Sequence, residues 1–175
     1  MSETSNICEV NEGAHGYELR FVRWYPQPIE KVWAALTQPD RLADWLAAAE
    51  VEPRRGGAFR LHWQVQDHRM TGVIVVCEPP THLAWTWPDP QHPNSVVSWR
   101  LAPENSGTRV TFTQDALPAS VLPDVATGWH THLEGLPEAA AGRSAPWRAD
   151  REREIATLYV GRLPIEESGE VNRSA

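Results

Sequence analysis

The order of hydrophobic and polar positions predicts one strand and two short helices at the start of the chain. Residues 17–25 (YELRFVRWY) alternate between apolar and polar side chains and predict a first strand. Apolar side chains then recur at helical spacing over residues 29–36, after Pro28, a residue suited to the first turn of a helix. Residues 39–46 predict a second short helix, for which Thr37 offers a side-chain cap.

After residue 55 the pattern changes to the period of two that is typical of half-buried strands. Gly56 and Gly57 suit a tight bend before the first of these strands. Proline-rich turns and an Asn-Ser-Gly turn separate the segments. Five apolar or alternating segments follow, at residues 59–63, 70–78, 83–87, 97–101 and 110–112. Consecutive strands joined by short turns predict an antiparallel meander.

Two more helices are predicted toward the C-terminal end. An apolar stripe over residues 125–136 predicts a long helix that Ser120 caps and Pro137 kinks or ends. Residues 147–163 carry a second helical stripe amid Arg and Glu side chains. This stripe packs either on its own domain or on a second copy of the chain, so a homodimer is one arrangement open to the protein. Its mixed charge differs from the basic polar face of membrane-surface helices.

The 175 residues are expected to form one principal domain. We assign residues 1–15 to a flexible tail, 16–142 to the domain, 143–163 to a helical appendage and 164–175 to a disordered tail.

Composition narrows the partners and the location. The net charge of −7 argues against a nucleic-acid binder, which needs a basic face. No apolar run approaches the roughly 20 residues of a membrane span, and the polar N-terminal segment is unlike a secretory signal. Two cysteines without a Cys-x-x-Cys motif indicate free thiols in a reducing compartment. We therefore expect a cytoplasmic protein.

The nine tryptophans are the unusual feature of the composition. A buried indole needs a large space and a partner for its N–H group. The aromatic row of the sheet should face the long helix, either as a filled core or as the wall of a small-molecule cavity. The candidate ligand-binding residues are Phe59, Trp63, Trp85, Trp87, Trp99, Phe112, Trp129 and Leu133.

Other motifs favour simpler interpretations. His130 and His132 stand about 200° apart on a helix, unlike the i, i+4 pair that binds zinc, so we interpret them as surface or rim histidines and predict no metal site. The arginine-glycine run at 54–57 lacks the context of a phosphate loop. We predict no catalytic residue and no cofactor, because the acid–base candidates lie at turns, element ends or polar faces: Asp44, His62, Asp67, Glu78 and Asp115.

Short motifs in a fixed order give the chain a family resemblance. They begin with PIEKVW at 28–33, LTQPD at 36–40 and GGAF at 56–59, and continue with EPP at 78–80, LAWTW at 83–87, WRL at 99–101, GTRVT at 107–111 and GW at 128–129. Over residues 17–142 the sequence resembles the Hsp90-ATPase-activator-homologue-like (AHSA1-type, SRPBCC) family of the START-like, Bet v 1-like superfamily.

The resemblance implies an α+β helix-grip fold, in which a curved antiparallel sheet wraps around a long C-terminal helix and two short helices follow the first strand. It implies a protein that holds a small hydrophobic or aromatic molecule in an internal cavity. Two alternatives stay open: a cavity enzyme of the cyclase, dehydratase or hydrolase kind, and a chaperone- or stress-related interaction module. Only about 16 residues precede the first strand, so we expect the separate N-terminal domain of eukaryotic Hsp90 activators to be missing.

Overall fold

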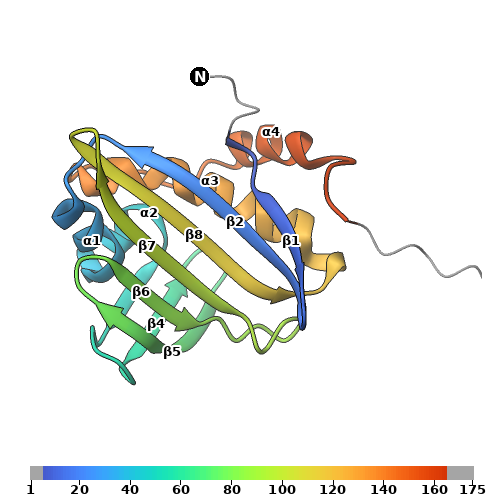
Figure 1. The fold of residues 1–175 in the computed structure, drawn as a ribbon, viewed down its shortest axis with the longest axis horizontal. Helices are drawn as coiled ribbons and strands as arrows, with labels where there is room; N and C mark the ends of the chain where they lie inside the picture. The colour runs from blue at the N-terminus through green and yellow to red at the C-terminus, as the bar shows by residue number, and fades with distance from the viewer. Residues whose placement is uncertain (1–5, 165–175) are drawn as a thin grey trace, which may run out of the picture.

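The fold is built on a single antiparallel sheet. The computed structural model describes residues 6–164. Its strands are β1 (Glu9–Gly13), β2 (Gly16–Tyr25), β3 (Ala48–Val51), β4 (Ala58–Trp63), β5 (His68–Glu78), β6 (His82–Thr86), β7 (Val96–Glu104) and β8 (Gly107–Leu117). They lie in the order β1-β2-β8-β7-β6-β5-β4-β3 (Figure 1). The sheet is curved, and every paired neighbour is antiparallel.

The helices complete an α+β helix-grip fold, as the sequence predicts. Between β2 and β3 lie α1 (Ile29–Thr37) and α2 (Pro39–Trp45); after β8 come a 3₁₀ turn, η2 (Ala119–Val121), the long α3 (Leu122–Ala140) and α4 (Ala149–Tyr159). Helix α3 runs behind the sheet, and α1 and α2 lie together at one end (Figure 1). Within the described part of the chain, no helix is long and apolar enough to span a membrane.

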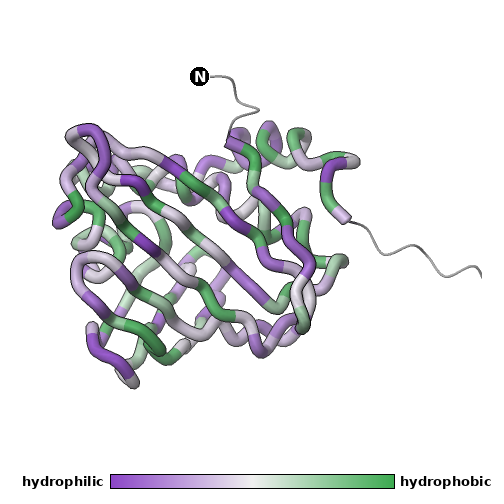
Figure 2. The backbone as a smooth tube through the Cα atoms, in the orientation of Figure 1, coloured by the Kyte–Doolittle hydropathy of each residue, from purple (hydrophilic) through white to green (hydrophobic). Residues whose placement is uncertain are grey.

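Alternating strands create the core between the sheet and α3. Inward and outward positions alternate along the strands, and the inward ones are buried. The colouring of Figure 2 follows this alternation only in part, because Val73 and Val75 of β5 are apolar but exposed. Trp99 on β7 is the register partner of Phe112 on β8, with ring centroids 4.5 Å apart. Trp129 on α3 contacts both rings, with its centroid 4.4 Å from that of Phe112 and 5.8 Å from that of Trp99. The aromatic row therefore faces the long helix.

A glycine allows two rings from non-adjacent strands to stack. Gly72 on β5 is the register partner of Phe59 on β4, and it lies between β4 and β6. A Cβ atom at Gly72 would lie 2.1 Å from the Thr86 carbonyl oxygen and 3.1 Å from the Trp85 ring. Because glycine leaves that space free, the rings of Phe59 and Trp85 stack across β5 at 4.0 Å and nearly parallel.

Two edge strands were not predicted. Strand β1 pairs residue for residue with β2 inside the segment assigned to a flexible tail, and Cys8 just before it is buried. Most of β1 is exposed, so main-chain pairing holds it and no apolar alternation marks it. Strand β3 is only four residues long and pairs with β4, which gives it too little pattern to detect.

The predicted helix boundaries need correction. Thr37 does not cap α2: its hydroxyl donates to the Trp33 carbonyl oxygen within α1, at 2.8 Å. Ser120 lies in η2 and gives α3 no side-chain cap. Thr37 thus has a competing backbone acceptor within its own helix, which a capping pattern does not reveal.

Pro137 lies inside α3, and the helix continues for three residues beyond it. A proline at this position has no N–H to donate to the carbonyl of Leu133, four residues earlier. The Tyr25 hydroxyl donates to that carbonyl instead, at 2.9 Å. A side chain from β2 thus replaces the missing helical hydrogen bond.

The C-terminal appendage docks on its own domain. Ile155 and Tyr159 of α4 are buried, and the Tyr159 hydroxyl lies 2.8 Å from Nδ1 of His130 on α3. Arg151 donates to both carboxylate oxygens of Glu134 on α3, at 2.8 and 3.0 Å. Of the two arrangements open from the sequence, the stripe adopts packing within the chain. The tail predicted to be disordered lies, from residue 165 on, outside the described residues.

Candidate ligand-binding cavity

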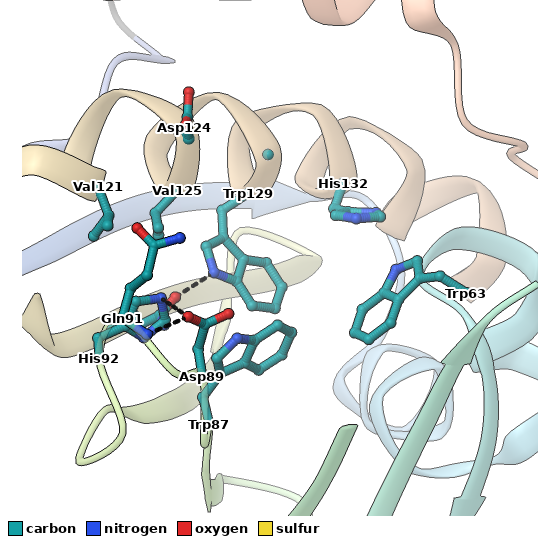
Figure 3. A pocket seen from close by; sticks show the side chains of 12 residues that line it. Trp63, Trp87, Asp89, Gln91, His92, Val121, Asp124, Val125, Trp129 and His132 are labelled. Carbon is teal, nitrogen blue, oxygen red and sulfur yellow. Dashed lines mark hydrogen bonds and ion pairs between the residues drawn. The ribbon is translucent and has the colours of Figure 1, made fainter. Parts of the chain in front are cut away.

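A cavity of about 300 Å³, open to solvent on one side, lies between one edge of the sheet and the N-terminal half of α3. Its wall combines aromatic rings with a few polar groups (Figure 3). The lining includes Trp63, Trp87, Asp89, Gly128, Trp129 and His132. Its volume is at the lower end of the roughly 300–1,000 Å³ range of small-molecule pockets.

Strand direction brings two of the tryptophans to the same edge. Trp63 is the last residue of β4, and Trp87 directly follows β6. Because β5 between them is antiparallel to both, β4 and β6 end at the same edge of the sheet. The Trp63 and Trp87 ring centroids are 5.9 Å apart, and Trp87 lies 5.0 Å from Trp129 on α3. Three indoles from distant parts of the chain therefore meet at the cavity.

A buried hydrogen-bond chain fixes the central indole. Trp129 Nε1 donates to Gln114 Oε1 at 2.5 Å, and Gln114 Nε2 donates to the Ser95 hydroxyl at 2.9 Å. The Ser95 hydroxyl in turn donates to the Asp115 carbonyl oxygen at 2.8 Å. Gln114 and Ser95 are completely or almost completely buried. Satisfied networks of this kind hold a side chain in one orientation.

The turn between β6 and β7 supplies the polar side of the cavity. Asp89 Oδ1 accepts a hydrogen bond from the Gln91 backbone N–H at 2.8 Å, and the Asp89 carbonyl accepts one from the His92 N–H at 3.0 Å. His92 is buried, with Nε2 3.7 Å from Asp89 Oδ1. The Asp89 carboxylate thus has a fixed position, between His92 and the Trp129 ring (Figure 3).

His132 lies on the α3 side with a defined protonation state. Burial lowers its pKa to about 4, so the imidazole is neutral near pH 7. Nδ1 lies 2.9 Å from the Trp45 carbonyl oxygen, which only accepts hydrogen bonds. Nδ1 therefore carries the proton, and Nε2 keeps a free lone pair. The cavity wall gains a neutral hydrogen-bond acceptor.

The eight predicted site residues divide into two groups. Trp63, Trp87 and Trp129 line the cavity. The other five are fully buried in the core and do not line it: Phe59, Trp85, Trp99, Phe112 and Leu133. Alternation indicates which side chains of a strand point inward. It does not indicate whether an inward ring lies in the core or at the end of the strand, where the cavity is. A ligand-binding role for any of the eight stays a prediction.

Sequence reasoning missed the polar half of the site. Asp89 and His92 lie in a segment whose sequence predicts only a turn. The one indication of a role in the site is that this segment directly follows Trp87. His130 and His132 do point to opposite sides of α3. His130, however, is not at the surface: it is 2 % exposed, because α4 covers it. Within residues 6–164 no three metal-ligating side chains converge.

A wider depression of about 790 Å³ adjoins the cavity and shares Trp63 and His132 with it. The segment between α3 and α4 forms part of its boundary, because the Ala145 N–H donates to the Asp44 carbonyl oxygen at 2.7 Å. Trp147 in this segment lies 4.6 Å from the His132 ring and is 42 % exposed.

This curved antiparallel sheet gripping a long C-terminal helix defines a helix-grip protein. The chain belongs to the family described as Activator of Hsp90 ATPase homolog 1-like protein, whose model matches residues 26–141. The family resemblance in the sequence is thereby confirmed. No curated protein matches the chain.

Solved structures agree with this membership. CalU16 from Micromonospora echinospora is 25% identical, with a TM-score of 0.70 over 87% of this chain and 93% of its own. The protein encoded by gene BPP1335 from Bordetella parapertussis is 29% identical, with a TM-score of 0.69 over 95% of this chain and 97% of its own. A structure described as an Aha1 dimer, from Colwellia psychrerythraea, is 17% identical, with a TM-score of 0.62 over 70% of this chain and 95% of its own.

Proposed function

We propose that the protein binds a small apolar or aromatic molecule in the cavity between Trp63, Trp87 and Trp129. The observation that carries this proposal is a pocket with three indole walls, open to solvent, beside an otherwise filled core. A volume of about 300 Å³ suits a molecule of one or two rings and is too small for a long-chain lipid. The open cavity weighs against a pure interaction module, which would have a filled core.

Gly128 offers a direct test, because it lines the cavity and a Cβ atom there would meet nothing within 4 Å. We expect a panel of indole, 1-naphthol and 2-phenylethanol to contain a compound that raises the melting temperature and changes tryptophan emission. At a hundredfold excess over Kd, binding adds about 2.7 kcal/mol to the free energy of unfolding. Gly128→Leu should fill the cavity and abolish the shift, whereas Gly128→Ala, the matched control, should retain most of it.

The result has two contrary outcomes. If no compound changes the melting temperature, the cavity is not a binding site for this class. If Gly128→Leu folds and shows the same shift as the wild type, the compound binds elsewhere, and the wider depression beside Trp147 becomes the next site to test.

A cavity enzyme is the second candidate, favoured by one specific observation. His132 is a neutral imidazole with a free Nε2 on the cavity wall, which is the form that a general base requires. Mass spectrometry of the bound compound after long incubation separates the two functions. A carrier returns it unchanged, whereas an enzyme converts it and loses conversion in His132→Phe.

A cytoplasmic location and a homodimer remain predictions. The described structure of Colwellia psychrerythraea is a dimer, but the apolar stripe that could serve a second copy is covered by α3 in this chain. Light scattering on the full chain gives the mass that decides between one and two subunits.

A further inference from the structure

The charged side chains of the cavity lining include two carboxylates, Asp89 and Asp124. Asp89 supplies a carboxylate, and His132 supplies the lone pair of Nε2. Of the described residues that line the cavity, none is Lys or Arg. The nearest titratable neighbour of the Asp89 carboxylate is the His92 imidazole, whose Nε2 lies 3.7 Å away. The wall therefore presents negative charge and lone pairs, and no permanent positive charge opposes them.

The aromatic part of the wall has the same electrostatic preference. The face of an indole is electron-rich and attracts a cation, most strongly where water is excluded. Trp129 is 4% exposed and Trp87 is half-buried, and their rings meet at 62° beside the Asp89 carboxylate (Figure 3). A cation placed here would contact ring faces and a carboxylate together.

The position of Asp89 is determined by the turn. Its Oδ1 holds the Gln91 N–H at 2.8 Å, and its side chain is 29 % exposed, so the carboxylate is only partly hydrated. No hydrogen bond of Oδ2 with a described residue is observed, which leaves this oxygen for a ligand.

From these contacts we infer that the cavity selects a protonated amine carried on a flat apolar body, with Asp89 as its counter-charge and the Trp87 and Trp129 rings as its aromatic support. This inference rests on the proposed function and narrows its ligand class. It requires that the charge of the ligand, in addition to its shape, determines its affinity for this site.

Three compounds of nearly equal size test the inference: 2-phenylethylamine, 2-phenylethanol and 3-phenylpropionate, which are cationic, neutral and anionic near neutral pH. Calorimetry at about pH 8, where an ordinary histidine is neutral, should give the amine a Kd about tenfold lower than the alcohol. The anion should bind more weakly than both. The preference for the amine should shrink with added salt, because screening weakens a partly exposed charge pair.

Two isosteric variants separate charge from structure. Asp89→Asn keeps an acceptor for the Gln91 N–H, so the turn should persist while the preference for the amine disappears. Asp124→Asn is the matched control: Asp124 also borders the cavity, but its carboxylate points away from the tryptophans in Figure 3. It should leave the preference intact.

The failures of the two proposals are distinguishable. Equal affinity for amine and alcohol, or an amine preference that survives in Asp89→Asn, overturns the inference and leaves the proposed function standing. Absence of binding by all three compounds, together with no thermal shift from indole or 1-naphthol, overturns both.

Discussion

At the scale of single residues, the tryptophans differ in what holds their indole N–H groups. Trp129 donates to Gln114, and Trp45 donates to the Ala35 carbonyl oxygen at 2.9 Å. The N–H groups of Trp85 and Trp99 are buried and have no acceptor among the described residues. Their rings are stacked, that of Trp85 on Phe59 at 4.0 Å and that of Trp99 near Trp85 at 6.3 Å.

This difference predicts unequal effects of the same substitution. Trp129→Phe and Trp99→Phe remove similar volumes, but only Trp129→Phe leaves the buried Gln114 Oε1 without its donor. We expect Trp129→Phe to lower the free energy of unfolding by about 1 kcal/mol more than Trp99→Phe. Urea denaturation of the two variants measures this directly, and equal losses would contradict the assigned role of Gln114.

At the scale of elements, the sequence predicted the strands that alternate and missed those that do not. The predicted strand at residues 59–63 lies within β4, because Phe59 and Leu61 alternate with polar neighbours. β1 and β3 are held by main-chain pairing at the edges of the sheet, which leaves little trace in residue type. Tyr25 illustrates the same limit, since its support of α3 beside Pro137 depends on a contact across 108 positions.

Glycines in a strand and in a helix provide a matched pair at this scale. Gly72→Ala places a Cβ atom against the Thr86 carbonyl and the Trp85 ring, so we expect a loss of at least about 2 kcal/mol. Gly128→Ala meets open space and should stabilise α3 by up to about 1 kcal/mol, because alanine favours a helix over glycine. Thermal unfolding with calorimetry tests both, and a well-tolerated Gly72→Ala would mean that the β5–β6 contact can relax.

At the scale of the whole molecule, two histidines on either side of α3 link folding to pH: His130, which is buried, and His132, which is partly buried. Burial is the first cause that lowers the pKa of His130 and of His132, in each case to about 4. The unfolded chain takes up these protons near the ordinary pKa of 6.5. Stability is therefore full above about pH 6.5 and decreases as the pH falls toward 4.

His130 isolates one part of this dependence. Glu134, Arg23 and Arg151 also act on its charge, but its burial under α4 dominates. Each such histidine contributes a slope of about 1.4 kcal/mol per pH unit between its two pKa values. His130→Gln should give a shallower loss of urea stability between pH 6.5 and 5 than the wild type, and parallel curves would contradict the neutral state of His130.

The candidate site was only half predictable from the chain. Three tryptophans of its wall could be predicted from alternation and helical spacing, because the apolar inner face of an element follows from its local sequence pattern. The position of Asp89 depends on the turn hydrogen bonds, and the orientation of His132 depends on the Trp45 carbonyl. Such contacts form only in the folded chain and leave no pattern in the sequence. Burial of Phe59 and Trp85 instead of cavity contact likewise depends on the gap left by Gly72.

The docking of α4 has a consequence for how fast a ligand exchanges. Helix α4 holds the outer face of α3 through Tyr159 and Arg151, while the inner face of α3 forms the cavity wall. A helix held in this way cannot swing outward without first losing those contacts. The cavity opens at the surface, so a molecule can pass without a movement of α3. Residence time then becomes a property of the contacts at the opening, Asp89 among them. A looser α4 would shorten that residence time, with the equilibrium preference among ligands unchanged.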